Sequence, residues 1–145
     1  LYAGCGAIGL GLVERSRSVS FNELGEASLA GLARGIEALG PELRARARVV
    51  AGSAEGAAAE VVPGSIVIVD PPRKGLEPGL LQSLAAAPPE QLLYVSCGLS
   101  SFLRDAEPLI AGGLRLESAT AYDLFPYTSH IETLASFRRT GTSAP

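Results

Sequence analysis

The chain has 145 residues, of which 47% are hydrophobic, and its formal net charge is −3. This length suffices for one domain with a full core, whereas an acidic domain is not expected to bind nucleic acid by charge alone. Two cysteines do not form a disulfide framework, so we expect a reducing, cytoplasmic setting. The single histidine, His130, lies in no cluster of metal-ligand spacing, so we expect no metal in this region. The absence of a long apolar run and of a signal-peptide pattern predicts no membrane partner.

The segment Gly4-Cys5-Gly6-Ala7-Ile8-Gly9 fits the pattern G-x-G-x-x-G. Glycines let the backbone turn tightly beside a ligand, and the helix expected over 8–15 offers free N–H groups. Glu23 ends the next expected strand, where an acid commonly binds the ribose of an adenosine-bearing cofactor, either a dinucleotide or S-adenosyl-L-methionine. A strand should precede the loop, so we interpret Leu1-Tyr2 as a truncated first strand and the chain as a piece of a longer protein. A plain glycine-rich turn is the alternative.

Apolar strands and helical patterns alternate along the chain. Strands are expected over 19–23, 48–51, 65–69 and 91–96, and helices over 26–39, about 55–62, 80–87 and 102–110. Two final strands, 114–124 and 131–137, are joined by a connection too short for a crossover helix, so they should be antiparallel. The sequence therefore predicts an α/β fold with a doubly wound, mostly parallel sheet and a C-terminal antiparallel β-hairpin. We expect residues 1–139 to form one catalytic domain and 140–145 to form a flexible tail.

Two further strand ends carry reactive side chains. Asp70 ends a central apolar strand, and two rigid prolines, Arg73 and Lys74 follow it, which favours a functional loop over a plain turn. Cys97 ends the apolar strand 91–96. In open parallel sheets, ligands bind outside the carboxyl ends of the strands, so this thiol should face a crevice. A buried, inert thiol is the alternative.

Three stretches of the chain together resemble the RNA (uracil-5-)-methyltransferase family, in order and in approximate spacing. They are Asp70-Pro71-Pro72-Arg73-Lys74-Gly75, Tyr94-Val95-Ser96-Cys97, and Asp123-Leu124-Phe125-Pro126 with His130-Ile131-Glu132. The loop Tyr2-Ala3-Gly4-Cys5-Gly6 also fits that family's cofactor motif. The resemblance extends to about Arg138 and implies a Rossmann-like methyltransferase fold, in which a terminal hairpin inserts one antiparallel strand. It implies S-adenosyl-L-methionine as cofactor and methylation of C5 of a uridine in rRNA or tRNA.

The family's chemistry implies a role for each matching position. Cys97 would add to C6 of uracil as the nucleophile, and Glu132 would remove the C5 proton as the base. The positions that would hold the cofactor are Tyr2, Gly4, Gly6, Glu23 and Asp70. The positions that would contact the target base are Asp70, Arg73, Tyr127 and His130. A uridine in folded RNA must be flipped out of its stack, and Phe125 or Tyr127 is a candidate to stack on it.

The chain departs from the family at two places. Gly98-Leu99 stands where Asn-Pro is usual, and Ser53 stands where an acid that can touch adenine is frequent. Arg104 and Asp105 match the family after the cysteine, and we interpret them as structural. We expect RNA binding to need N-terminal regions outside this chain.

Three alternatives stay open on the sequence alone. The chain could be a cofactor-binding fragment that is inactive on its own. It could be an amino-methyltransferase acting on nucleic acid, which would leave Cys97 without a role. A nicotinamide dehydrogenase would explain Gly4, Gly6 and Glu23, but none of the later motifs.

Overall fold

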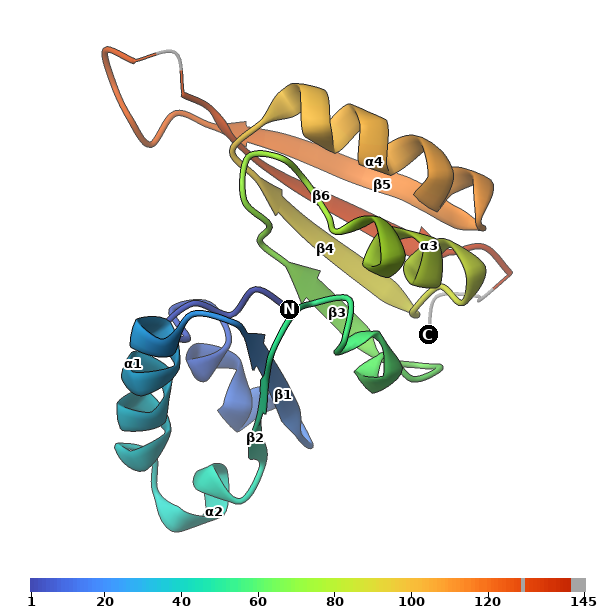
Figure 1. The fold of residues 1–145 in the computed structure, drawn as a ribbon. Helices are drawn as coiled ribbons and strands as arrows, with labels where there is room; N and C mark the ends of the chain where they lie inside the picture. Colours follow the sequence, from blue (N-terminus) through green and yellow to red (C-terminus); the bar gives the residue numbers. More distant parts are fainter. Residues whose placement is uncertain (129, 142–145) are drawn as a thin grey trace. The chain divides into compact units, whose positions relative to one another are not determined.

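The computed structural model describes residues 1–128 and 130–141. Strands and helices alternate through these residues, and the chain divides into two compact units, Leu1–Glu60 and Val61–Pro145 (Figure 1). Each unit has its own sheet. The predicted α/β class is therefore confirmed, and each unit can be described by itself.

The first unit is built on two parallel strands, β1 (Val19–Glu23) and β2 (Ala47–Ala51). Its other elements are the 3-10 helices η1 (Leu10–Arg15) and η2 (Ala58–Glu60) and the α-helices α1 (Glu26–Glu37) and α2 (Pro41–Arg44). The core of the unit consists of Val13, Phe21 and Leu32, one each from η1, β1 and α1. Pro41 begins α2 at a position where its missing N–H costs nothing.

Two segments predicted as regular helices in the first part of the chain form 3-10 helices and turns instead. The segment 8–15 forms a 3-10 helix over Leu10–Arg15, because glycines at 6, 9 and 11 disfavour a regular α-helix. The alanine-rich segment 55–62 forms turns and the three-residue η2, because Gly56 interrupts it and Pro63 follows. Residues 1–3 are not a strand, although the Ala3 N–H donates to the Asn22 carbonyl at 2.8 Å.

The second unit has four strands in the order β3-β4-β6-β5. They are β3 (Ile66–Val69), β4 (Gln91–Ser96), β5 (Leu114–Tyr122) and β6 (Glu132–Arg139). β3 and β4 are parallel, whereas β6 runs antiparallel to both of its neighbours. The predicted C-terminal antiparallel hairpin is confirmed, and β6 inserts between β4 and β5.

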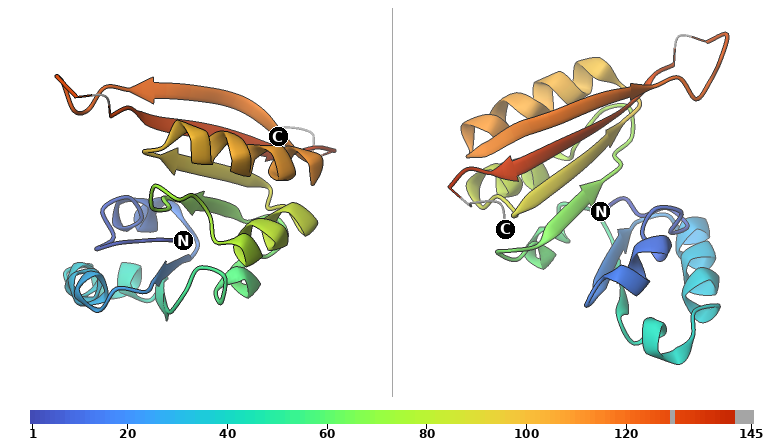
Figure 2. Two further views of the ribbon diagram at one scale, coloured as in Figure 1. Left: turned by 45° about the horizontal axis from the view of Figure 1, so that its top comes forward. Right: turned by 180° about the vertical axis from the view of Figure 1, so that it is seen from behind.

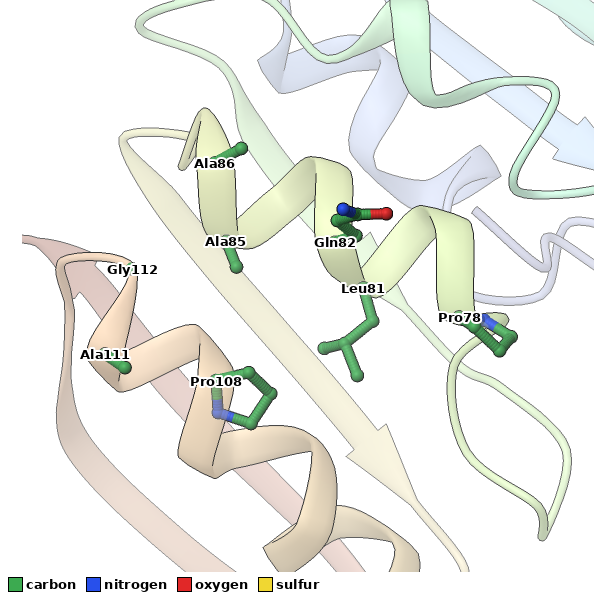
Figure 3. Close-up of a pocket in the computed structure, with 8 residues that line it drawn as sticks. All are labelled: Pro78, Leu81, Gln82, Ala85, Ala86, Pro108, Ala111 and Gly112. Carbon is green, nitrogen blue, oxygen red and sulfur yellow. The ribbon is translucent and has the colours of Figure 1, made fainter.

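Two helices, α3 (Pro78–Ala86) and α4 (Leu99–Ala111), lie on one face of this sheet (Figures 1 and 2). Alternate residues of β4 are buried beneath them, and the Tyr94 ring meets the Phe102 ring edge-on at 5.3 Å. An open apolar groove runs between the two helices, where Leu81 of α3 points toward Pro108 of α4 (Figure 3). This packing fixes where β4 ends and α4 begins, which is the segment that contains Cys97.

The predicted tail begins with an ordered residue. The Thr140 N–H and hydroxyl both donate to the Gly113 carbonyl, at 2.8 and 2.9 Å. Residues 142–145, the rest of that predicted tail, lie outside the described residues. Within the described part of the chain, none of the helices has the length and apolar character that crossing a membrane requires.

Candidate active site

Cys97 and Glu132 lie at the ends of two paired strands. Cys97 directly follows β4, and Glu132 is the first residue of β6. The antiparallel ladder pairs Ser96 with Thr133, so the same register carried one residue further sets Cys97 opposite Glu132. Directly opposed side chains in such a ladder have Cβ atoms about 4.5–5.5 Å apart. Extended by one residue past the end of β4, the register predicts that these two residues are cross-strand neighbours.

The pleat of the sheet directs both side chains to the same face. Ser96 is buried on the face that α3 and α4 cover, so alternation directs Cys97 to the other face. Ala135 of β6 is buried on the helix-covered face as well. Glu132, three residues earlier in the same strand, therefore shares the face of Cys97.

Asp70 joins this face from the neighbouring strand. The parallel ladder pairs buried Val69 with Tyr94, so Asp70, which follows β3, points to the same side as Cys97. Asp70 keeps an exposed surface, yet partial burial of its carboxyl group raises its pKa, and the negative charge of Glu132 raises it further. Two carboxyl groups close enough to repel one another therefore lie at the strand ends that flank the thiol.

Hydroxyl groups hold the turn that carries Cys97. The Gly98 N–H donates to Ser96 Oγ at 3.1 Å, and the Ser101 hydroxyl donates to the Gly98 carbonyl at 2.8 Å. A Cβ atom at Gly98 would lie 3.2 Å from the Arg73 carbonyl oxygen, so the loop after Asp70 passes close over this turn. Glycine in place of the family's asparagine suits that close approach. Cys97 itself is half-buried and carries a free thiol.

The loop between β5 and β6 extends beyond the sheet (Figure 1) and brings His130 near Arg73. Arg73 Nη2 lies 3.3 Å from Nδ1 and 3.4 Å from Nε2 of the imidazole, and both residues are exposed. The Phe125 ring meets the imidazole edge-on at 6.4 Å, while Tyr127 is fully exposed with a φ of 67°. That these residues contact the target base stays a prediction.

The glycine loop of the first unit adopts the strained backbone that glycine permits. Gly4 and Gly6 have φ values of 56° and 92°, and Tyr2 has a φ of 58°. A Cβ atom at Gly4 would meet nothing within 4 Å, so the backbone is open to close approach there. These features suit a ligand that lies against the loop.

Glu23 ties this loop to the start of α1. Its Oε2 accepts the Gly4 N–H at 2.7 Å, and its Oε1 accepts the N–H groups of Leu24 and Gly25 at 2.9 and 2.7 Å. Partial burial acts to raise the pKa of Glu23, but these three hydrogen bonds outweigh it and hold the pKa below its ordinary value. The lowered pKa favours the ionised carboxylate, which offers only acceptors to hydroxyl or N–H donors.

Sequence reasoning missed the role of Asn22. It is buried, and its Nδ2 donates to the carbonyls of Val50, Gly52 and Ser53, which fixes the segment after β2 beside Glu23. The sequence signal that could have indicated this role is a polar residue within a short strand. A buried amide without hydrogen bonds would lower the stability of the fold, so its partners had to be nearby. Among residues 1–128 and 130–141, no three His, Cys, Asp or Glu side chains are grouped to hold a metal ion.

These features define a Rossmann-like methyltransferase, with a glycine loop, an acid after it, and an antiparallel strand inserted near the end of the sheet. The sequence profile of the tRNA (uracil-5-)-methyltransferase family matches residues 58–139. The chain belongs to this family, as its resemblance to the RNA (uracil-5-)-methyltransferases predicts.

Known relatives and structures agree with this assignment. An uncharacterized RNA methyltransferase of Protochlamydia amoebophila is 35% identical over 95% of this chain, which covers 36% of that protein. The crystal structure of the Pyrococcus abyssi tRNA (uracil-54, C5)-methyltransferase with S-adenosyl-L-homocysteine has a TM-score of 0.75 and 31% identity, over 94% of this chain and 32% of that one. The chain thus spans about a third of the length of these proteins.

A more distant structure shows the fold alone. The C-terminal domain of precorrin-6Y C5,15-methyltransferase from Rhodobacter capsulatus has a TM-score of 0.67 at 18% identity, over 95% of this chain and 77% of that one. The predicted Rossmann-like methyltransferase fold is therefore confirmed beyond the family itself.

The lowered pKa of Glu23 predicts a pH-dependent contribution to stability. Because its folded-state pKa lies below its unfolded value, the carboxylate stabilises the fold above the ordinary glutamate pKa of about 4.3. That contribution is lost as the pH falls through the lowered folded value. In urea unfolding, wild type should be more stable than Glu23→Gln at neutral pH, and the difference should shrink in acid. A difference that is constant with pH would contradict this account.

Proposed function

We propose that the protein carrying this chain methylates C5 of a uridine in RNA, through a covalent bond between Cys97 Sγ and C6 of the base. The observation that carries the proposal is the shared face of Cys97, Glu132 and Asp70 at three adjacent strand ends. Membership of the tRNA (uracil-5-)-methyltransferase family supports it. One relative is an RNA methyltransferase and another acts on tRNA, which supports an RNA substrate, either rRNA or tRNA.

S-adenosyl-L-methionine is the cofactor, and it supplies an electrophilic methyl group when bound. The residues of the first unit fit it. Gly4 leaves the loop backbone open to a ligand, Gly6 supplies a positive φ where a side chain would clash with Leu10 and Leu32, and Glu23 presents an ionised carboxylate that suits the ribose hydroxyls. Tyr2 belongs to the same loop, and a contact of Asp70 with the cofactor stays a prediction from the sequence.

Cys97 activates the base by covalent addition. C5 of uracil is a weak nucleophile, so direct attack on a methyl sulfonium group is slow. Addition of the Cys97 thiolate to C6 breaks the C5–C6 double bond and leaves its electron pair as an enolate, with density on C5. C5 would then take the methyl group, the donor sulfur would keep the electron pair of the broken S–C bond, and C5 would become a saturated carbon that carries both a proton and the new methyl.

Glu132 completes the reaction as the base. Its carboxylate removes the C5 proton, and the electron pair of that C–H bond re-forms the C5–C6 double bond as the Cys97 thiolate leaves C6. The cross-strand position of Glu132 beside Cys97 suits this step, because the proton and the sulfur leave adjacent carbons of one ring. Asp70, whose pKa is raised by partial burial and by Glu132, lies beside the same ring.

The target uridine must be held once it has left the RNA stack. Arg73 and His130 form an exposed pair near this face, and Phe125 and Tyr127 are exposed aromatic residues of the β5–β6 loop. A base stacked on either ring is stabilised by about 1–3 kcal/mol. The net charge of −3 supports the view that other regions of the full-length protein supply most of the RNA affinity.

A covalent trap tests the nucleophile. Full-length protein is mixed with S-adenosyl-L-methionine and substrate RNA containing 5-fluorouridine, whose fluorine cannot leave as a proton does. Wild type should accumulate a protein–RNA adduct, seen as a shifted band, with the RNA on Cys97 in peptide mass spectra. Cys97→Ala should give no adduct, whereas Cys5→Ala, which removes the other thiol of this chain, should still give it. Absence of an adduct with the wild-type protein would contradict the proposed mechanism.

Removal of the base should trap the methylated intermediate on ordinary RNA. In Glu132→Gln the thiolate still adds and C5 is still methylated, but the C5 proton has no acceptor, so the turnover rate should fall roughly 10²- to 10⁴-fold. A covalent complex containing one new methyl group should persist in denaturing gels. Glu90→Gln is the matched control, because Glu90 is an acid that directly precedes β4, at the end of the strand opposite to Cys97. Normal turnover by Glu132→Gln would show that another group removes the C5 proton.

A further inference from the structure

Asp105 of α4 is a fully buried acid that the proposed mechanism does not use. Its Oδ2 accepts the Tyr94 hydroxyl and the Leu76 N–H, both at 2.8 Å. Its Oδ1 accepts Nη2 and Nε of Arg104 at 2.8 and 3.1 Å. Both carboxylate oxygens are therefore fully used, and each serves a different partner.

The partners of Asp105 come from the two segments that carry Asp70 and Cys97. Tyr94 lies in β4, three residues before Cys97. Leu76 ends the loop that begins at Asp70, and this loop leads from β3 back over the start of α4 (Figure 1). Asp105 Oδ2 thus joins β4, which leads to Cys97, to the loop that begins at Asp70.

Further contacts stiffen the loop between these points. Arg104 Nη2 donates to the Lys74 carbonyl at 2.6 Å, and the Gly75 N–H donates to the Pro72 carbonyl at 2.8 Å. Gly75 has a φ of 87°, and a Cβ atom there would lie 2.5 Å from Arg104 Nη2, so the loop passes directly against the pair of Arg104 and Asp105. The prolines at 71 and 72 restrict the remaining backbone. These contacts leave the loop backbone little freedom between Leu76 and Asp70.

We propose that Asp105, with Tyr94 and Arg104, is a positioning device for the active site. It fixes the loop 70–76 against β4, so that Asp70 and Arg73 keep their places beside Cys97. This inference rests on the proposed function only for the roles of Asp70 and Cys97. The hydrogen bonds themselves stand without it. Asp105 does not touch the substrate, so it acts through the loop.

The substitution Asp105→Asn separates the effect of the hydrogen bonds from the effect of the packing. Asp105→Asn keeps the shape of the side chain but replaces one acceptor oxygen with an NH₂ group. Either Arg104 or the pair of Tyr94 and Leu76 then faces a donor instead of an acceptor, and the loop loses one of its two attachments. A displacement of the loop by about 1 Å is enough to cost roughly 100-fold in rate.

The test compares Asp105→Asn with Leu109→Ala in the full-length protein. Leu109 is fully buried on the same helix, so its truncation destabilises the core without removing a bond to the loop. With saturating RNA and S-adenosyl-L-methionine, and at a temperature where both variants are folded, Asp105→Asn should lower kcat roughly 10- to 100-fold with KM little changed. Leu109→Ala should keep kcat within about threefold of wild type. Equal kcat values for the two variants would overturn the proposal.

Two further measurements keep the proposal testable if Asp105→Asn folds poorly or if the chemistry differs. Tyr94→Phe removes only the hydroxyl, and it should lower kcat several-fold while KM stays the same. Hydrogen exchange in the absence of RNA should be faster at the Leu76 amide in Asp105→Ala, which removes both acceptor oxygens, than in Leu109→Ala. Unchanged protection at Leu76 would refute the positioning role. If the wild-type protein forms no fluorouridine adduct, the proposed function is wrong. The exchange rate at Leu76 still tests whether Asp105 holds the loop 70–76.

Discussion

The antiparallel pairing of β4 with β6 is the constraint on which the candidate active site depends. Cys97 and Glu132 are far apart in the sequence, and the insertion of β6 between β4 and β5 brings the strand ends that carry them side by side. A slip of one residue would exchange the faces of β6 and move buried Ala135 and Phe137 away from the helices. Burial of these two residues therefore selects the register that sets Glu132 opposite Cys97.

The acids at the strand ends are placed in contrasting environments. Glu23 accepts three backbone N–H groups that hold its pKa low, whereas partial burial and the charge of Glu132 raise the pKa of Asp70. The pKa of one acid is thus lowered, which favours its ionised form as an acceptor, and the other lies close enough to Glu132 for the two carboxyl groups to repel. Opposed shifts of this kind separate binding roles from proton-handling roles in enzyme sites. The buried Asp105 adds a third use of an acid, as a fixed set of acceptors that holds a loop.

The sequence predicts the buried strands of the fold well, and the glycine-containing segments and the buried side-chain contacts poorly. The apolar run that forms β4 was bounded correctly at 91–96, and the short connection before β6 predicted antiparallel pairing. The segments 8–15 and 55–62 failed because glycines within them outweigh alanine and leucine propensity. The partners of Asp105 could not be predicted, because nothing local to α4 indicates that its carboxylate meets Tyr94 and the Leu76 N–H.

A designed disulfide tests the central claim, the pairing of residue 97 with residue 132, most directly. In a Cys5→Ala background, Glu132→Cys leaves two thiols in this chain, at 97 and 132. Cross-strand neighbours bring Cα atoms within the range of about 4.4–6.8 Å that a disulfide requires. Mild oxidation should therefore yield a peptide cross-linked between residues 97 and 132, and loss of both free thiols. Two thiols that stay free and reactive under the same oxidant would contradict the pairing.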